Sequence, residues 1–387
     1  MRVLHVGKFF HPYRGGIENF LLDLALELKR SGIVSSILAH HERPLRRTQN
    51  EILDGLEILR TLSLGQILYA PIAPSFGRHL SRLIRGFKPD LLHIHVPNIS
   101  AFFVLAAQKR PPYIVHWHAD VVPSIIDRRL RLFYPPYSLL EKALLKNAEA
   151  IIVTSQAYLD ASPPLVPFQH KCHVVPLGLD PARLCCLEQT GISPASTKSP
   201  HRFTVMCAGR FTYYKGFQFL IEAAQQVPEA RFILAGEGPL RKRMMEKVAL
   251  LGLKDRVFLP GLLSDHELHL LIAGCDVFCL PSIERTEAFG LVLLEAMAFG
   301  KALVTTDIEG SGVNWVNQDG ITGLVVRPRD SEAIADAIKR LAREPHLRRS
   351  MGDKARKRFA ELFHIRKVTQ EVISIYSTCQ ATSSRGR

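Results

Sequence analysis

The sequence lacks several features by which common classes of protein are identified. Its seven cysteines are odd in number and form no C-x-x-C pair, which argues against a disulfide framework and against a cysteine zinc site. No apolar run approaches the roughly 18 residues that a membrane span needs, and the chain starts with a strand-like segment rather than a signal peptide. We therefore expect a cytoplasmic protein in a reducing compartment, associated at most with the inner face of a membrane.

Two signatures of phosphate binding are also missing. The aspartates form no D-x-D, the usual place for a divalent cation that bridges a diphosphate. The glycines near the N-terminus do not form G-x-G-x-x-G, which disfavours a nicotinamide or flavin dinucleotide. We therefore expect no metal and no cofactor, so that cationic side chains and a helix end would have to bind any phosphate.

Basic residues exceed acidic ones, with 50 Lys+Arg against 36 Asp+Glu and a formal net charge of +14. Residues 1–190 carry 22 basic and 15 acidic groups, and residues 191–387 carry 28 and 21, so the excess is spread evenly. No basic stripe interleaved with aromatics and no nucleic-acid recognition motif is present. Phosphorylated small molecules or anionic lipid headgroups fit this charge better than nucleic acid.

The chain of 387 residues is longer than one hydrophobic core normally supports, because such cores stop growing at roughly 250 to 300 residues. In both halves short apolar runs alternate with amphipathic stretches such as Ile17–Ser31, the pattern of a parallel sheet flanked by helices. We predict two doubly wound, Rossmann-like α/β domains that face a central cleft. The predicted strands are Val3–Gly7, Ile33–Ala39, Leu91–His95, Tyr113–His116, Ala150–Thr154, Phe203–Ala208, Arg231–Ala235, Arg256–Leu259, Asp276–Leu280, Ala302–Thr305 and Gly323–Val326.

The domain boundary is expected in a segment rich in Ser, Thr, Pro and Gly that has no apolar period. We predict a first domain over residues 1–186, a linker over 187–200, a second domain over 201–360 and a terminal helical segment over 361–387.

The segment Pro281–Gly300 carries the clearest signal for a binding site. An apolar strand ends before it, a polar loop follows, and a helix is expected to begin near Phe289. Gly290 lets a ligand approach the backbone, and the first free N–H groups of a helix bind anions. Glu287 and Glu295 lie on either side of this turn and suit the hydroxyl groups of a sugar nucleotide. Taken singly, each is more often a solvated glutamate.

Two further loops follow predicted strands, at the carboxyl ends where doubly wound sheets bind ligands. Arg210 and Lys215 could together neutralise a diphosphate, although exposed cations at a turn are the more common case. Gly15 and Gly16 allow positive φ and close approach to a diphosphate or sugar, but such a pair is often only a turn.

The histidines at the ends of two predicted strands have more than one interpretation. His116, His118 and Asp120, with His93 and His95, resemble part of a metal-ligand set. No H-x-x-x-H accompanies them, which disfavours a metal. Alternatively His118 donates a hydrogen bond to a substrate hydroxyl, or it is a histidine satisfied within the fold.

These motifs, in this order, resemble those of the family-four retaining glycosyltransferases of GT-B type, over nearly the whole chain. The resemblance implies that Arg210 and Lys215 hold the donor diphosphate, that Glu287 contacts the donor sugar and that Glu295 contacts the ribose. It implies that His118 contacts the transferred sugar and that the helix after about Phe359 crosses back onto the first domain. The implied catalytic residues are His118, Arg210, Lys215 and Glu287, and the implied donor-binding residues are Gly15, Gly16, Phe289, Gly290, Leu291 and Glu295.

The implied reaction is metal-independent hexosyl transfer, with retention, from a nucleoside-diphosphate sugar to a saccharide or lipid-linked acceptor in surface polysaccharide synthesis. Glu309–Val313 is similar to mannosyl-type relatives and slightly favours GDP-mannose over a UDP-sugar. Arg78–Lys88 and Arg128–Tyr134 mix cations with apolar residues and could contact an anionic membrane. The alternatives are a nucleotide-sugar isomerase (epimerase) on a similar scaffold, or a metal-dependent hydrolase that uses His116, His118 and Asp120.

Overall fold

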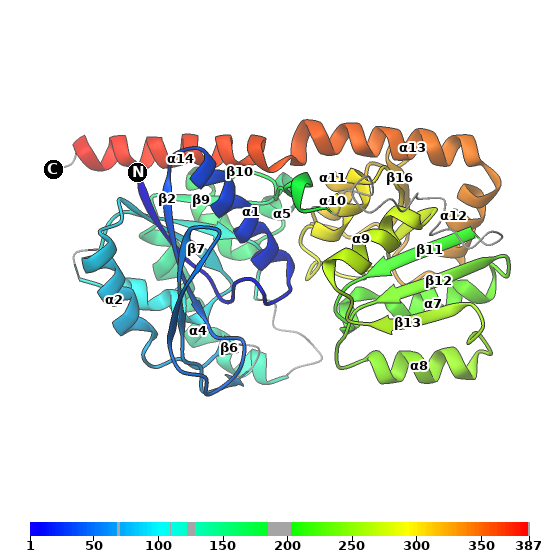
Figure 1. The fold of residues 1–387 in the computed structure, drawn as a ribbon, viewed down its shortest axis with the longest axis horizontal. Coiled ribbons are helices and arrows are strands. Elements are labelled where there is room, and N and C mark those ends of the chain that lie inside the picture. The colour runs from blue at the N-terminus through cyan, green and yellow to red at the C-terminus, as the bar shows by residue number, and fades with distance from the viewer. Residues whose placement is uncertain (68–69, 109, 122–127, 185–202, 386–387) are drawn as a thin grey trace. The chain divides into compact units, whose positions relative to one another are not determined.

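The structure, a computed structural model, describes residues 1–67, 70–108, 110–121, 128–184 and 203–385. These residues form two compact units. The first unit consists of residues 1–178 together with 365–387, and the second unit consists of residues 179–364 (Figure 1). The predicted linker at 187–200 lies outside the described residues.

The first unit is built on an eight-stranded sheet in the order β10-β9-β8-β7-β1-β2-β4-β3. All neighbouring strands are parallel except the edge strand β3, which is antiparallel to β4. The strands are β1 (Arg2–Val6), β2 (Val34–His40), β3 (Gln49–Leu53), β4 (Leu56–Thr61), β7 (Leu91–Val96), β8 (Tyr113–Trp117), β9 (Ala150–Val153) and β10 (Cys172–Val174). A separate antiparallel pair consists of β5 (Gln66–Ile67) and β6 (Ala70–Pro71).

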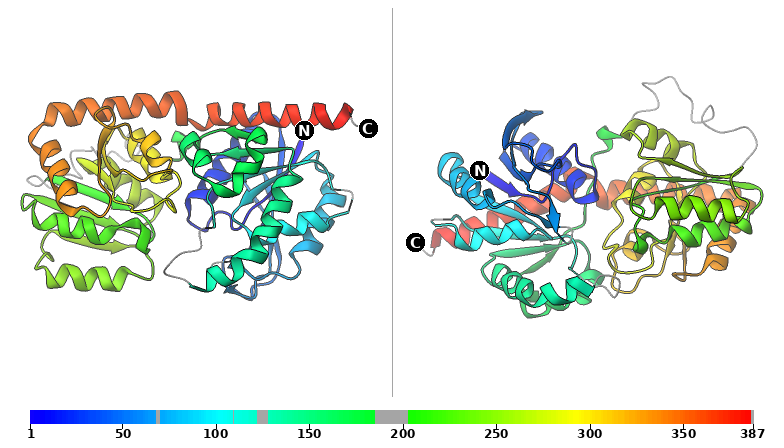
Figure 2. Two further views of the ribbon diagram at one scale, coloured as in Figure 1. Left: turned by 180° about the vertical axis from the view of Figure 1, so that it is seen from behind. Right: turned by 90° about the horizontal axis from the view of Figure 1, so that it is seen from below.

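The helices of the first unit bury apolar faces against this sheet. In α1 (Gly16–Arg30), the residues spaced by three and four that predicted a helix, Phe20, Leu21, Leu24 and Leu28, are all buried. The last helix, α14 (Ile365–Arg385), packs against α1 and is drawn in red in Figure 2. The remaining helices are α2 (Phe76–Phe87), η1 (Ile99–Phe102), α3 (Phe103–Ala106), α4 (Arg128–Lys146), α5 (Gln156–Asp160) and η2 (Pro163–Lys171).

The second unit is built on a six-stranded, wholly parallel sheet in the order β13-β12-β11-β14-β15-β16. Numbered from its own first strand this order is 3-2-1-4-5-6, that of a doubly wound nucleotide-binding sheet. The strands are β11 (Phe203–Ala208), β12 (Ala230–Ala235), β13 (Val257–Gly261), β14 (Val277–Leu280), β15 (Ala302–Thr306) and β16 (Gly323–Val326).

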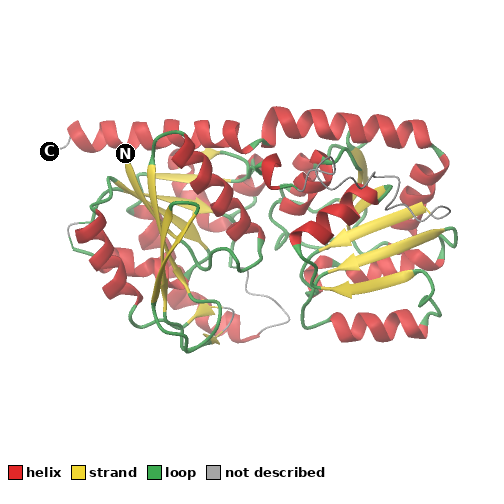
Figure 3. Ribbon diagram, in the orientation of Figure 1, coloured by secondary structure: helices red, strands yellow, loops and turns green. Residues whose placement is uncertain are grey.

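Helices lie on both faces of this second sheet (Figure 3). A large apolar core joins the sheet to α7, α8, α12 and α13 through residues such as Leu220, Met244, Ile338 and Met351, while α9 and α10 contact β11, β14 and β15. The helices are η3 (Pro181–Arg183), η4 (Tyr213–Lys215), α7 (Phe217–Gln225), α8 (Arg241–Leu250), α9 (Asp265–Gly274), α10 (Leu291–Ala298), α11 (Val313–Val316), α12 (Ser331–Arg343), α13 (Pro345–Arg358) and η5 (Phe359–Phe363). Among the helices described in either unit, none is both long enough and apolar enough to cross a membrane.

All eleven predicted strands are present, with ends that differ by at most two residues. The prediction of two α/β units with parallel sheets is confirmed. Three strands of the first sheet, β3, β4 and β10, were not predicted.

The strand orders fix where a ligand would bind in each unit. In the second unit β11 and β14 are neighbours although two strands separate them in the chain, and in the first unit β1 and β7 are neighbours in the same way. The connections that leave such a pair run in opposite directions and open a crevice at the carboxyl ends of the two strands. The loops after β11 and β14, and those after β1 and β7, are therefore the places to look for a site.

Candidate functional site

The loop after β11 brings Lys215 back over the end of its own strand. Gly209 has φ +157°, and a side chain there would lie 3.2 Å from Lys215 Cε. Gly216 has φ +65°, and a side chain there would overlap the carbonyl oxygen of Pro281 in the loop after β14. The backbone N–H of Ile283 donates to the carbonyl of Tyr214 at 2.8 Å and joins the same two loops. Arg210 lies on the first of these loops and is exposed.

An ion pair joins the ends of these loops. The Nζ atom of Lys215 lies 2.5 Å from Oε2 of Glu287, and both residues are at most 9% exposed. The hydroxyl of Ser282 donates to the same Oε2 at 2.8 Å. The structure thus brings together two of the predicted site residues, with a serine that the sequence did not single out. A buried charge requires such pairing, since the desolvation of an isolated one would cost on the order of several kcal/mol.

The pair keeps the lysine charged despite its burial. Burial by itself would lower the pKa of Lys215, but the attraction of Glu287, with smaller contributions from Tyr214 and the hydrogen bond to Glu287, raises the pKa above its ordinary value. The second unit therefore holds a fixed ammonium at the carboxyl ends of β11 and β14. An ammonium has three N–H donors, and the one directed at Glu287 leaves two for another anion.

The helix that follows Glu287 begins slightly later than predicted. Gly290 has φ +81° and precedes α10, which starts at Leu291. The neighbouring Phe289 is buried and packs edge-on against Phe363 with a ring-centroid distance of 6.0 Å. Glu295 is also buried, one turn into α10. The segment has the expected strand, loop and helix start, so the backbone N–H groups of its first turn lie at the same sheet edge as Lys215.

The two glycines of the first unit do not use the conformation that was expected of them. Gly15 is extended, with φ −171°, and Gly16 is the first residue of α1, so neither adopts the left-handed region. Gly15 lies close to the carboxylate of Glu18, which a side chain at position 15 would displace. The N-terminus of α1 still lies directly after β1, at a carboxyl end of the first sheet.

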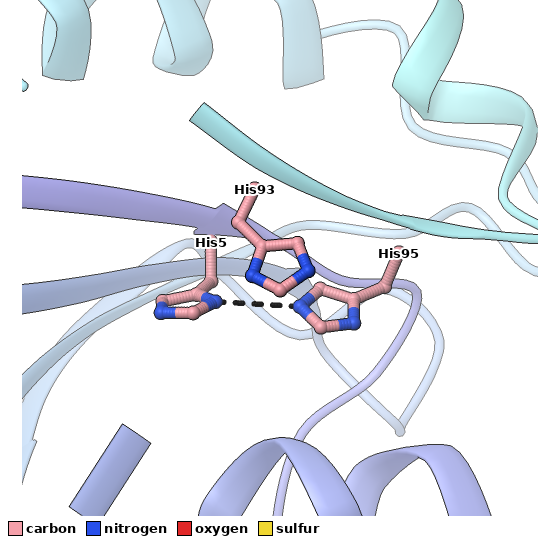
Figure 4. Close-up of side chains that lie close together, drawn as sticks. All are labelled: His5, His93 and His95. Carbon is pink, nitrogen blue, oxygen red and sulfur yellow. Dashed lines mark hydrogen bonds between the residues drawn. The ribbon is translucent and has the colours of Figure 1, made fainter. Parts of the chain in front are cut away.

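His118 belongs to a buried group of imidazoles. It follows β8 and is 4% exposed, and its Nε2 lies 3.0 Å from Nδ1 of His95. His5, His93 and His116 complete the group, and Figure 4 shows three of its members. Burial lowers the pKa of His5 and of His118 to about 3, and burial with neighbouring imidazoles lowers the pKa of the other three well below its ordinary value. All five are therefore neutral at pH 7.

The alternative of a metal site formed by His116, His118 and Asp120 is not supported by the geometry. Asp120 Oδ1 accepts hydrogen bonds from Trp117 Nε1 at 2.8 Å and from Ser162 Oγ at 2.7 Å, so this oxygen holds β8 to the loop before η2. Within the described part of the chain, the groups of nitrogens or carboxylates close enough to share an ion consist of histidines alone.

Two features of the site were missed at the level of sequence. Ser282 lies next to the predicted loop but carries no motif, and its role depends on where Glu287 points. His5 could have been found from the sequence. It lies on β1 opposite His93 of β7, and both strands were predicted, so that a parallel pairing of the two would have placed these histidines side by side.

Comparison with known proteins finds a family match for each half of the chain. Residues 14–183 match the sequence model of Glycosyltransferase Family 4, and residues 189–358 match that of Glycosyl transferases group 1. The two matches together span both units.

Individual relatives cover the whole chain. The chain is 28% identical over 392 residues to the O-antigen chain mannosyltransferase C of Escherichia coli, covering 99% of this chain and 100% of that protein. It is 29% identical over 374 residues to the D-rhamnosyltransferase WbpZ of Pseudomonas aeruginosa, covering 94% and 92%. The sucrose-phosphate synthase of Thermosynechococcus elongatus, of GT-B fold, superimposes with a TM-score of 0.79 at 21% identity over 98% of this chain and 99% of that one.

The Lys215–Glu287 pair should be strongly coupled in its effect on stability. Because each single change leaves the other charge buried without its partner, Lys215→Met and Glu287→Gln should each lower the free energy of unfolding of the second unit by about 3 kcal/mol or more. The double variant should lose clearly less than the sum of the two. Urea unfolding followed by the fluorescence of Trp315, in a Trp117→Phe background, measures this unit alone because the chain has one tryptophan in each unit.

The matched control is the Lys247–Glu222 ion pair, which is also in the second unit but has side chains 28% and 33% exposed. Its coupling should not exceed about 1 kcal/mol. Equal coupling in the two pairs would show that the burial of Lys215 and Glu287 has no energetic consequence.

The neutral imidazoles should make the first unit sensitive to acid. Their folded-state pKa lies below the unfolded value of about 6.5, so the unfolded chain binds more protons as the pH falls through that value, and the free energy of unfolding falls with it. Between pH 7.5 and 5.5 each such histidine costs about 1.4 kcal/mol, and the five together cost about 7 kcal/mol. Urea midpoints from the fluorescence of Trp117, in a Trp315→Phe variant, measure this loss.

The second unit provides the comparison, since His269, with a pKa lowered by burial to about 4, is the buried histidine of its described residues. The urea midpoint of the second unit should shift much less over the same pH range. A first unit as stable at pH 5.5 as at pH 7.5 would contradict the neutrality of the five imidazoles.

Proposed function

Because this chain belongs to the family-four, group 1 glycosyltransferases, we propose that it transfers a manno-configured hexosyl group from a nucleoside-diphosphate sugar to a saccharide or lipid-linked acceptor in surface polysaccharide synthesis. The anomeric configuration is retained. The observation that supports this most directly is the buried Lys215–Glu287 pair at the carboxyl ends of β11 and β14, where a doubly wound sheet binds nucleotides.

The donor diphosphate is assigned to the cations of the second unit. Lys215 directs two N–H donors at the phosphates while it keeps Glu287 in place, and Arg210 adds a planar fork that suits a phosphate. The backbone amides of residues 289–291 extend the same site. Because the chain has no D-x-D, these groups, rather than a bridging cation, neutralise the departing nucleoside diphosphate. Such donors, fixed in advance, stabilise developing negative charge in the transition state.

The sugar and the nucleoside are assigned to the two glutamates. Glu287 binds Lys215 and Ser282 through Oε2, and we assign its Oε1 to hydroxyls of the donor sugar. Glu295, on α10, accepts hydrogen bonds from the ribose. His118 of the first unit contacts the transferred sugar, and the loop at Gly15 and Gly16 contributes to binding of the diphosphate.

A manno-configured sugar is favoured by the relatives. One transfers mannose, and the other transfers D-rhamnose, which is 6-deoxymannose and has the same configuration at carbons 2 to 4. The first relative is named as an O-antigen chain mannosyltransferase, which supports a saccharide acceptor in surface polysaccharide synthesis. GDP-mannose is therefore our first choice of donor, ahead of a UDP-sugar.

The acceptor side is assigned to helices of the first unit that expose apolar and basic residues. Leu132, Phe133, Leu139 and Leu140 on α4 are exposed by 46% or more, and Arg78, Arg82 and Arg85 on α2 are exposed. The side chains of residues 128–131, part of the basic segment noted in the sequence, lie outside the described residues. Apolar side chains together with cations suit the headgroup region of an anionic membrane. We propose that the enzyme works at the inner face of such a membrane.

Removal of the cations should reduce turnover far more than donor affinity. Arg210→Ala and Lys215→Ala should each lower kcat by roughly 100-fold, because one well-placed donor to the developing charge is worth about 3 kcal/mol. Glu287→Ala should also lower kcat, whereas Glu295→Ala should mainly raise KM for the donor. The measurement is GDP release from GDP-mannose that depends on a lipid-linked saccharide fraction, with UDP-glucose as the competing donor.

The control variant is Arg243→Ala, which removes an exposed cation of α8 in the same unit and should leave kcat unchanged. Thermal unfolding of each variant separates lost turnover from lost folding. Near-normal kcat in both Arg210→Ala and Lys215→Ala would refute the assignment of the diphosphate.

Membrane association should depend on both charge and apolar surface. Phosphatidylglycerol vesicles should retain the protein at low salt, and phosphatidylcholine vesicles should not. The double change Leu132→Ser and Phe133→Ser should reduce retention several-fold, since each side chain loses apolar burial in the membrane. Leu250→Ser changes an equally exposed leucine on α8 of the second unit and should have no effect. If neither salt nor the substitutions in α4 changed the retention, this surface would not be the one that binds the membrane.

A further inference from the structure

The five buried imidazoles of the first unit are arranged in two hydrogen-bonded rows. In one row His5 Nδ1 lies 3.3 Å from His95 Nε2, and His95 Nδ1 lies 3.0 Å from His118 Nε2 (Figure 4 shows the first of these contacts). In the other row the Tyr376 hydroxyl lies 2.6 Å from His93 Nδ1, and His93 Nε2 lies 3.2 Å from His116 Nδ1. Strands β1, β7 and β8 are adjacent in the interior of the sheet, and the pairing of His5 with His93 and of His95 with His116 brings these side chains together.

The rows are stacked on each other, which distinguishes them from a metal site. The rings of His116 and His118 are 4.2 Å apart and 5° from parallel, and those of His93 and His95 are 4.3 Å apart and 22° from parallel. A metal ion lies near the plane of each imidazole that binds it, and two stacked parallel rings share no such point. The contacts within each row are instead those of N–H groups facing ring nitrogens.

The first row allows only two arrangements of its protons. A neutral imidazole has one N–H and one lone pair, and both contacts of the row join an Nδ1 to an Nε2. If His95 carries its proton on Nδ1, it donates to His118, and His5 must donate to it from Nδ1. If His95 carries its proton on Nε2, both neighbours must do the same. The three rings therefore share one tautomer, because any mixture leaves two N–H groups or two lone pairs facing each other.

We propose that His5 and His95 are positioning residues that set which nitrogen of His118 carries its proton, and hence whether His118 donates to or accepts from the sugar. This inference rests on the proposed function, in which His118 contacts the transferred sugar. His118 Nδ1 is the open end of the row, since it has no hydrogen-bond partner among the described residues. In the shared Nδ1–H tautomer this atom donates to a lone pair of the sugar hydroxyl, and in the Nε2–H tautomer it accepts from that hydroxyl. Because Nδ1 is enclosed, contact with a sugar hydroxyl requires a local rearrangement of the side chains around His118.

The row is tested first in the free protein, without any substrate. Two-bond ¹H–¹⁵N correlation spectra of histidine-labelled protein distinguish a protonated ring nitrogen from one with a lone pair. His5, His95 and His118 should report the same tautomer, and Nδ1–H is the form expected. If the three rings differ in tautomer, or if any of them is charged at pH 7, the row does not exist as described.

The positioning role is tested by two changes of nearly the same shape at the centre of the row. His95→Asn keeps a polar amide near the position of Nδ1, within reach of His118 Nε2, whereas His95→Leu keeps the shape and removes the hydrogen bond. We expect His95→Leu to lower kcat roughly tenfold, the effect of losing one buried hydrogen bond, and His95→Asn to retain most of it. A role in packing alone predicts the opposite order, because leucine is the better core residue. Equal or reversed kcat values would overturn the proposal.

The second row supplies the matched control. His93 is as deeply buried as His95 and stacks on it, but its side chain hydrogen-bonds to Tyr376 and His116. His93→Asn and His93→Leu should therefore give the same kcat, and His118 should keep its tautomer in both. A change of tautomer at His118 in these variants would overturn the independence of the two rows.

These results separate this inference from the proposed function. If no nucleotide sugar is turned over, the proposed function fails while the spectra still decide whether the three rings share a tautomer. If His118→Ala leaves kcat unchanged in an active enzyme, His118 does not contact the sugar, and the positioning role of His5 and His95 is overturned.

Discussion

The contact between the Lys215 ammonium and the Glu287 carboxylate is the interaction on which the proposed donor site depends. The two residues come from the loops after β11 and β14, the neighbouring strands at which the connections of the second sheet diverge. Neither charge would be tolerated at this burial without the other. The glycines at 209 and 216 serve the same contact, since the first leaves room for the lysine and the second lets its loop pack on the carbonyl of Pro281. The strand order determines which loops can meet, and the ion pair determines how they meet.

The first unit places polar groups at the equivalent edge of its sheet without any charge. Five imidazoles satisfy one another in two rows, and burial keeps them neutral at pH 7. This difference matches the chemistry proposed for each unit. A departing diphosphate is an anion, and fixed positive groups stabilise it. A sugar hydroxyl is neutral, and an uncharged donor of defined tautomer recognises it without the cost of burying a further charge.

Strands that consist of continuous apolar runs were predictable from the sequence, and strands that depend on tertiary contacts were not. The central strands of both sheets were predicted because each strand of a parallel sheet covered on both faces is a short run of residues such as Val, Ile and Leu. β4 was missed because it contains Glu57 and Arg60. Arg60 is nevertheless buried, since its guanidinium pairs with Glu51 on β3 and donates to the carbonyl of Phe10. Such a strand is recognisable only once its partner is known. β10 has three residues, too few to show a pattern.

The sequence predicted that residues of two loops would lie near each other, but it did not predict how they contact each other. Lys215 and Glu287 come together because the carboxyl ends of parallel strands lie at the same end of a sheet. Whether Lys215 would be exposed beside Arg210 or buried against Glu287 depends on the positive φ angles of Gly209 and Gly216, and residue spacing does not encode these angles.

The histidines show even more clearly that spacing does not determine how side chains contact each other. An H-x-H pattern on each of two adjacent strands predicts a cluster of imidazoles, and such a cluster could also be a metal-binding site. Only the stacking of the rings, with nitrogens that face one another within each row, favours an array that holds protons over one that holds an ion. The chemistry of such a cluster therefore follows from ring orientation, which is determined by the packing of the whole sheet.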